Sequence, residues 1–109
     1  AYAELEQQLE RAQQLAQQAL NALPGNPNIL DTLGFVYLKS GDATKAIDLF
    51  SEVLDKRPHL AATRYHLALA YHQAGEKARA RDQLDLALQS EFSEKAAALK
   101  FKESLDHSQ

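Results

Sequence analysis

The sequence predicts an all-α protein, built as a solenoid of antiparallel helix pairs. Two observations predict this fold class. The chain of 109 residues matches itself when it is shifted by 34 positions, and each 34-residue unit carries two runs of apolar residues at helical spacing. The shift superposes identical residues, among them Leu33 on Leu67, Tyr37 on Tyr71 and Gly41 on Gly75. Repeats of this length stack side by side and bury a continuous core.

The first complete unit covers residues 27–60. Asn26 is suited to cap its first helix, and Pro27 fits the first helical position, where an N–H is not needed. Gly41 is expected to end this helix, because glycine accepts the left-handed backbone that follows a helix C-terminus. Asp42 is expected to cap the second helix, which Pro58 terminates. The apolar residues of the two helices are Leu30, Leu33, Val36 and Tyr37, then Ala46, Leu49, Phe50, Val53 and Leu54.

The second complete unit covers residues 61–94 and repeats this pattern with Leu67, Ala70, Tyr71, Gly75, Ala80, Leu84, Ala87 and Leu88. Residues 95–106 are expected to form a capping helix that starts after Ser93, because the last unit of a solenoid would otherwise expose its apolar face. Its inner side is predicted to carry Ala98, Phe101 and Leu105. We expect residues 107–109 to be a frayed tail.

Residues 1–26 are predicted to be a partial repeat with one continuous helix from about residue 2 to residue 23. An uninterrupted helical spacing, in Leu5, Leu9, Ala12, Ala16, Ala19 and Leu23, crosses the position where the period would place a turn. The chain starts without methionine, so we expect it to come from a longer protein. In a longer protein, one side of this helix would meet a preceding helix. In this chain that side is expected to offer a surface for self-association, with Leu5, Leu9 and Ala16. The whole chain, 1–109, is expected to be one domain.

Gly34 lies inside the first helix of its unit, where glycine costs about 1 kcal/mol relative to alanine. Ala68 takes its place one repeat later. A small residue at this position predicts a close approach of the paired helix. We therefore expect Gly34→Ala to be mild and Gly34→Leu to destabilise by about 1–3 kcal/mol through overpacking.

The unit resembles the tetratricopeptide repeat, whose period is also 34 residues. The motif residues present are Leu33, Gly34, Tyr37, Gly41, Ala46, Phe50 and Pro58, and in the second copy Leu67, Ala68, Tyr71, Gly75, Ala80, Leu84 and Ala87. The tryptophan that the family usually has near the start is replaced by Leu30 and Arg64. The resemblance implies a right-handed superhelix of about two and a half repeats with a C-terminal cap, whose concave groove is lined by the first helix of each unit.

The stretches "NPNILDTLGFVYLKSGD" and "RYHLALAYHQAGEKARARDQL" also resemble the final repeats of large bacterial multi-repeat proteins, some of them linked to exopolysaccharide export and surface-protein sorting. This narrower resemblance is compatible with a soluble protein of the bacterial cytoplasm or of the periplasm. The compartment stays open between the two.

The resemblance further implies that non-core residues of the first helices contact a protein partner. We expect these contacts at Asn28, Asp31, Thr32, Phe35, Lys39, Tyr65, His66, Leu69, His72 and Gln73, with Leu38 and Ala62 beside them. Tyr65 is expected to be exposed, whereas Phe35 and Leu69 either contact the partner or pack against adjacent helices. A mixture of aromatic, amide and imidazole groups suits an extended peptide or an amphipathic helix. The basic pair with which some members clamp a C-terminal carboxylate is missing.

Other function classes find little support. A net charge of −3 provides no basic face for nucleic acid, and no apolar run approaches the roughly 20 residues of a membrane span. His66 and His72 are six positions apart on one helix, whereas metal-binding pairs usually lie three or four apart. No nucleophile, base and orienting group are expected to converge, so we predict neither an enzyme nor a bound cofactor. Two alternatives to partner binding remain open: a purely structural end-cap of a longer scaffold, and a homo-oligomerisation element.

Overall fold

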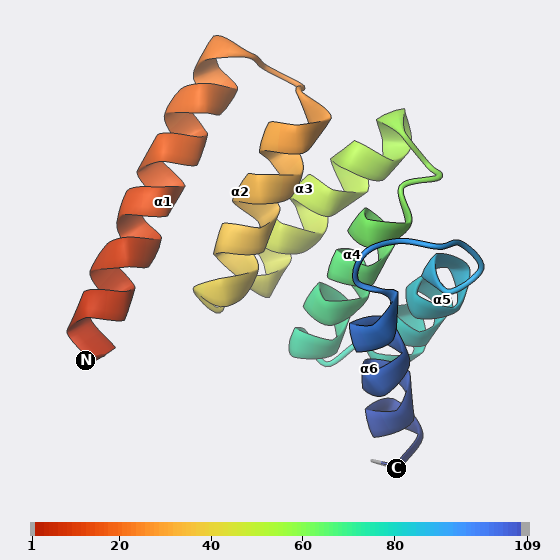
Figure 1. Ribbon diagram of the computed structural model, residues 1–109. Helices are drawn as coiled ribbons and strands as arrows, with labels where there is room; N and C mark the ends of the chain where they lie inside the picture. The colour runs from red at the N-terminus through yellow and green to blue at the C-terminus, as the bar shows by residue number, and fades with distance from the viewer. Residues whose placement is uncertain (1, 108–109) are drawn as a thin grey trace.

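The computed structural model describes residues 2–107 of the chain (Figure 1). Within this range it contains helices and no strand. The helices are α1 Tyr2–Ala22, α2 Pro27–Lys39, α3 Ala43–Lys56, α4 Ala61–Gln73, α5 Lys77–Ala87 and α6 Lys95–His107. His107 is therefore helical and not part of a frayed tail, because α6 continues one residue beyond its predicted end. Residues 108 and 109 lie outside the described residues.

The helices form a layered array of antiparallel pairs. α2 packs against α3 and α4 against α5, while α3 packs against α4 and so joins the two pairs (Figure 1). α1 packs against α2 at one end of the array, and α6 packs against α5 at the other. The shortest dimension of the molecule is 23 Å, which fits two layers of helices of about 10 Å each. The fold is therefore the all-α array of helix pairs that the repeat predicted.

Short capping motifs determine where the helices begin and end. The Asn26 side chain accepts hydrogen bonds from the backbone N–H groups of Asn28 and Ile29, at 3.0 and 3.3 Å. Gly41 and Gly75 follow α2 and α4 with φ angles of +90° and +84°, which only glycine adopts without strain. These turns reverse the chain after the first helix of each unit.

The C-terminal cap begins at the predicted residue but is preceded by a different capping position. α6 begins at Lys95, so Glu94 and not Ser93 occupies the position immediately before the helix. The inner side of α6 contributes Ala98 and Leu105 to a buried cluster whose other members come from the second repeat: Tyr65, Ala68, Leu84 and Ala87. α6 thus covers the apolar side of the last helix pair.

Gly34 lies against the ring of Phe50 on the paired helix α3. A Cβ atom added at Gly34 would lie 2.7 Å from Phe50 Cε1, closer than van der Waals contact allows. Phe50 is completely buried, so its ring has no free space into which to move. The expected close helix approach is therefore present, and it is tighter than the expectation of a mild Gly34→Ala allowed for, because even one methyl group needs repacking. Gly34→Ala is now expected to destabilise the fold.

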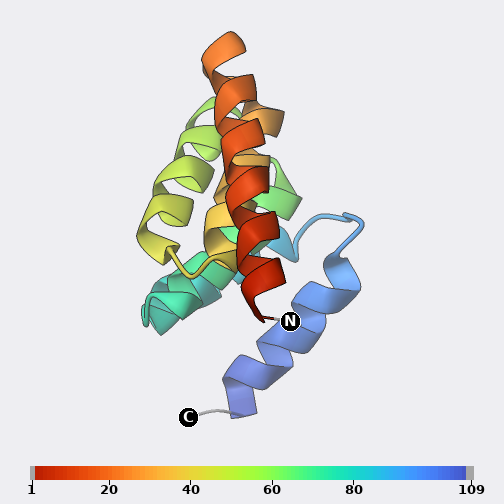
Figure 2. The ribbon, with the colours of Figure 1, turned by 90° about the vertical axis from the view of Figure 1, so that its left-hand side faces the viewer.

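α1 runs without interruption through residues 6–9, where the period would have placed a turn. Its outward side faces the viewer in Figure 2. Leu15 is 60% exposed, and Leu5 is 54% exposed although it lines a hollow between α1 and the end of α2. Ala16, which was expected on the open side of this helix, is buried instead, because the helix turns it toward the array. None of the helices in residues 2–107 combines the length and the hydropathy needed to cross a membrane.

Candidate functional site

We call the surface formed by the side chains of α2 and α4 that point away from α3 and α5 the groove face. Helices two positions apart in an antiparallel array run in the same direction, so the first turns of α2 and α4 are neighbours, and so are their last turns. A hollow lies at each of these two places. Seven of the ten residues predicted to contact a partner line one of the two hollows.

The N-terminal hollow has a volume of about 290 Å³. It is lined by Pro27, Asn28, Asp31, Thr32, Leu60, Ala62 and Thr63. Its polar groups are mostly engaged within the protein: Thr63 Oγ1 donates to Asp31 Oδ1 at 2.9 Å, and Thr32 Oγ1 donates to the Asn28 carbonyl at 2.9 Å. Thr63 was not singled out from the sequence, because a buried threonine has no signature there.

The C-terminal hollow is open and has a volume of about 430 Å³. It is lined by Leu38, Lys39, Leu69, His72 and Gln73. Gln73 Nε2 donates to the Leu38 carbonyl at 3.1 Å and so bridges the last turns of α4 and α2. Leu38 was expected among the non-core residues but is buried in the core cluster. Lys39 and His72 are exposed. This hollow combines an apolar floor with cationic and amide groups on its rim.

Phe35 occupies the middle of the groove face, between the two hollows. Its ring lies edge-on to the His66 ring with 5.2 Å between centroids, and Lys39 Nζ lies 5.2 Å from the Phe35 ring centroid. Phe35 and Leu69 are both half-buried and pack against the buried core. The two residues therefore pack against adjacent helices, which was one of the two alternatives expected from the sequence. Part of each side chain remains exposed to solvent.

His66 is buried, which differs from the prediction of an open groove contact. It is 7% exposed, and both of its ring nitrogens face carboxylates: Nδ1 lies 3.3 Å from Asp31 Oδ1 and Nε2 lies 2.9 Å from Glu94 Oε1. Burial lowers the pKa of this imidazole, but the hydrogen bond and charge of Asp31, together with those of Glu94, outweigh it and raise the pKa above its ordinary value. His66 is thus part of a buried network that links α2, α4 and the segment before α6.

Tyr65 is also buried, and the expectation that it is exposed is wrong. It is 7% exposed and packs beside Phe92 and Phe101, with ring centroids 6.2 and 6.5 Å apart. α6 and the segment before it cover the ring, which the repeat pattern could not reveal. Burial, and secondarily the charge of Glu94, raise the pKa of the Tyr65 phenol above its ordinary value.

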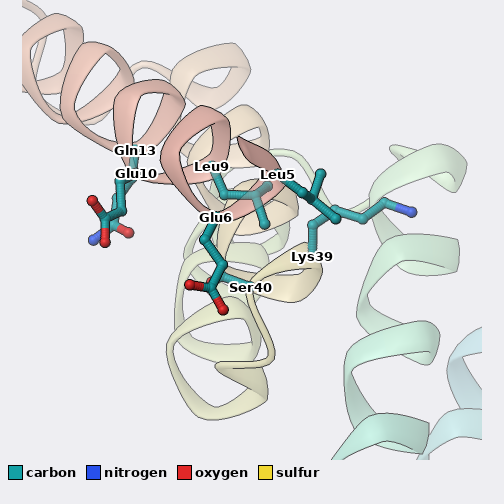
Figure 3. A pocket seen from close by; sticks show the side chains of 7 residues that line it. All are labelled: Leu5, Glu6, Leu9, Glu10, Gln13, Lys39 and Ser40. Carbon is teal, nitrogen blue, oxygen red and sulfur yellow. The ribbon is translucent and has the colours of Figure 1, made fainter. Parts of the chain in front are cut away.

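A further hollow of about 380 Å³ lies between α1 and the end of α2, outside the groove face. Figure 3 shows Leu5 and Leu9 pointing from α1 toward Lys39 and Ser40 at the end of α2. Glu6, Glu10 and Gln13 complete its lining. Across residues 2–107 no group of three histidine or acidic side chains is arranged to hold a metal ion.

Comparison with known proteins places these features in a family. A family model described as "Tetratricopeptide repeat" matches residues 37–103, more than half of the chain. Photosystem I assembly protein Ycf3 of Rippkaea orientalis (strain PCC 8801 / RF-1) is 33% identical over 51 residues, which cover 47% of this chain and 30% of that protein. The protein of the same name from Acaryochloris marina (strain MBIC 11017) is 32% identical over 59 residues, 54% of this chain and 36% of that protein. The chain thus spans about a third of the length of these curated relatives.

Proposed function

Because this chain belongs to the tetratricopeptide repeat family, whose members are generally protein-interaction modules, we propose that it is a non-catalytic scaffold that binds a partner protein on its groove face. The partner would present an extended peptide or an amphipathic helix. The relatives carry the name of an assembly protein, and an assembly role for this chain, in which it holds a partner in place while a complex forms, is part of the proposal.

The observation that carries the proposal is the arrangement of the groove face. The two hollows lie on the same side of two neighbouring repeats, and the half-buried ring of Phe35 lies between them. An extended chain bound along this face could place one apolar side chain on Leu69 in the C-terminal hollow. The ammonium group of Lys39 beside that hollow favours a carboxylate on the same segment.

The proposal is tested by selecting ligands from a phage-displayed random-peptide library on the intact chain and measuring the affinity of the selected peptides for variants. Phe35→Ser combined with Leu69→Ser is expected to weaken binding at least about tenfold, equivalent to about 1.4 kcal/mol. Lys39→Ser removes an exposed ammonium group that lies beside the Phe35 ring. It should weaken the binding of acidic peptides and change the melting temperature little. Leu86→Ser is the matched control, because Leu86 is an exposed leucine on α5, away from the groove face.

Unchanged affinity in the double variant, at an unchanged circular-dichroism spectrum, would rule out the groove face as the binding site. Failure to select any specific peptide would favour the structural end-cap. Self-association through α1 would instead appear as concentration-dependent sedimentation that Leu5→Glu abolishes and that the groove variants leave unaltered.

A further inference from the structure

The network around His66 connects three parts of the molecule that are distant in sequence. Asp31 comes from α2, His66 from α4, and Glu94 from the segment between α5 and α6. The two carboxylates are 35 and 28 positions away from His66 along the chain. The single imidazole therefore connects the first repeat, the second repeat and the start of the C-terminal cap.

The geometry requires His66 to be doubly protonated for both contacts to be favourable. An ionised carboxylate only accepts hydrogen bonds, and Asp31 Oδ1 already accepts one from the Thr63 hydroxyl. A neutral imidazole has one N–H and one lone pair, so it can donate to one carboxylate only. Its other nitrogen would then face a carboxylate oxygen about 3 Å away, lone pair against lone pair. The imidazolium ion donates to both and compensates their charge.

Three aromatic rings also lie beside the imidazole. Phe35 from α2, Phe50 from α3 and Tyr65 from α4 have ring centroids 5.2, 5.7 and 5.8 Å from that of His66. The titratable and charged groups facing His66 among the described contacts are thus Asp31, Glu94 and the phenol of Tyr65. Partial exclusion of water strengthens the interaction of the imidazolium with the two carboxylates.

We propose that the Asp31–His66–Glu94 network is a pH-responsive latch, which fastens the α5–α6 segment and its cap to the groove face when His66 is protonated and loosens it when His66 is neutral. α6 begins directly after Glu94, so the hold on Glu94 is also a hold on the first turn of the cap. Tyr65 packs beneath Phe92 and Phe101 of that same segment. Loosening the latch therefore uncovers the Tyr65 ring beside the groove face.

The direction of the pH dependence follows from the raised pKa of His66. Protons bind more tightly to the folded than to the unfolded state, so the latch contributes its full stability below the ordinary imidazole pKa of about 6.5. That contribution is lost as the pH rises through the higher pKa of the folded protein. The latch is thus closed on the acidic side of neutrality and loosens on the alkaline side.

The test is an NMR titration of the intact chain from about pH 5.5 to about pH 9, a range that spans histidine ionisation. The ring proton shifts of His66 are expected to titrate with a midpoint above 6.5, and the backbone amides of α6 are expected to follow the same midpoint. Over the same range the melting temperature is expected to fall as the pH rises through the His66 midpoint. His66→Gln should remove both the α6 response and its share of the melting-temperature change.

Charge-removing variants separate the latch from a merely structural hydrogen bond. Glu94→Gln keeps an oxygen that can accept from His66 but loses the charge, so it should lower the His66 midpoint and reduce the α6 response. Glu94→Gln also tests the latch if the His66→Gln variant does not fold. Glu91→Gln, three residues earlier, is the matched control, because Glu91 is paired with Lys95 and should leave the midpoint unchanged. His59→Gln controls for an exposed histidine in a turn.

Two results would overturn the proposal. The first is a His66 midpoint at or below 6.5, which would mean that the carboxylates do not hold a proton on the ring. The second is that the backbone amide shifts of α6 do not titrate with the His66 midpoint, or that they do so to the same extent in the Glu94→Gln variant as in the unmodified protein. Neither result depends on a partner protein, so the latch and the proposed function can fail separately.

Discussion

At the scale of single residues, the two helices of each repeat contact each other through a different pair of residues. In the first repeat Gly34 faces Phe50, and a methyl group on the glycine would press on the phenyl ring. The period of 34 places Ala68 and Leu84 at the same two positions, where both are completely buried in one cluster. The first repeat thus combines its smallest possible residue with a large ring, and the second combines a slightly larger residue with a smaller side chain. Close packing of both interiors favours such compensation in volume.

Exchanging the pair tests this compensation. Gly34→Ala is expected to destabilise the fold by about 1–3 kcal/mol through overpacking, and Phe50→Leu by about 1–2 kcal/mol through the space it leaves. The double variant recreates the pair of the second repeat, so it should be more stable than the sum of the single changes, with a coupling of about 0.5–3 kcal/mol. Urea unfolding of the four proteins measures this cycle. Strictly additive effects would show that the two side chains do not share one space.

At the scale of helices, the second helix of each unit begins in the same backbone conformation with a different capping residue. Asp42 precedes α3 with φ −98° and ψ 76°, and its side chain accepts from Lys45 N–H at 3.2 Å. Glu76 precedes α5 with φ −98° and ψ 73°, but its longer side chain makes no capping hydrogen bond. The backbone is thus prepared for a cap that the glutamate does not supply.

Glu76→Asp is therefore expected to stabilise the fold by about 0.5–1 kcal/mol, since aspartate is among the best N-cap residues. The converse change Asp42→Glu should destabilise by a similar amount. The exposed Glu76–Arg79 pair, at 3.7 Å, contributes little to the balance. Thermal unfolding of both variants measures the effect. If neither variant changes the melting temperature, the side-chain cap at Asp42 has no energetic role in this fold.

At the scale of the whole molecule, the two ends of the array differ. At the α6 end, Leu105 and Ala98 are buried against the last repeat. Arg81 of α5 strengthens this junction by donating to the Asp106 carboxylate at 2.6 Å and to the Leu105 carbonyl at 3.0 Å. At the α1 end, Leu5 and Leu15 are exposed. The C-terminal end of the array is therefore closed by its own helix, whereas the outer side of α1 is open.

Leucine truncations on α6 measure how much this closure contributes to stability. Leu105 is 3% exposed, so Leu105→Ala should destabilise by about 2–5 kcal/mol. Leu99 lies on the same helix and is 49% exposed, so Leu99→Ala should change the free energy of unfolding by no more than about 0.5 kcal/mol. Chemical denaturation of both variants gives the comparison. Equal effects would mean that α6 is not held by the packing of its inner side.

The sequence by itself determined what depends on local chemistry and on the repeat. Helix periodicity, the cap at Asn26 and the glycines after α2 and α4 act over a few residues, so the all-α array of helix pairs could be predicted from them. The positions on the groove face followed as well, because a 34-residue period fixes which side of each first helix is turned toward its partner helix. Seven of the ten predicted contact residues line the two hollows for this reason.

Only the tertiary structure decided how the side chains in the middle of that face are used. Tyr65 is covered by Phe92 and Phe101, and His66 is held by Asp31 and Glu94. Those contacts join residues that are about 27 to 36 positions apart in the sequence. Two of the partners, Phe92 and Glu94, lie in the segment before the cap, where the repeat pattern ends. Packing across such distances depends on how α6 closes the array, a property of the assembled helices that no single helix encodes.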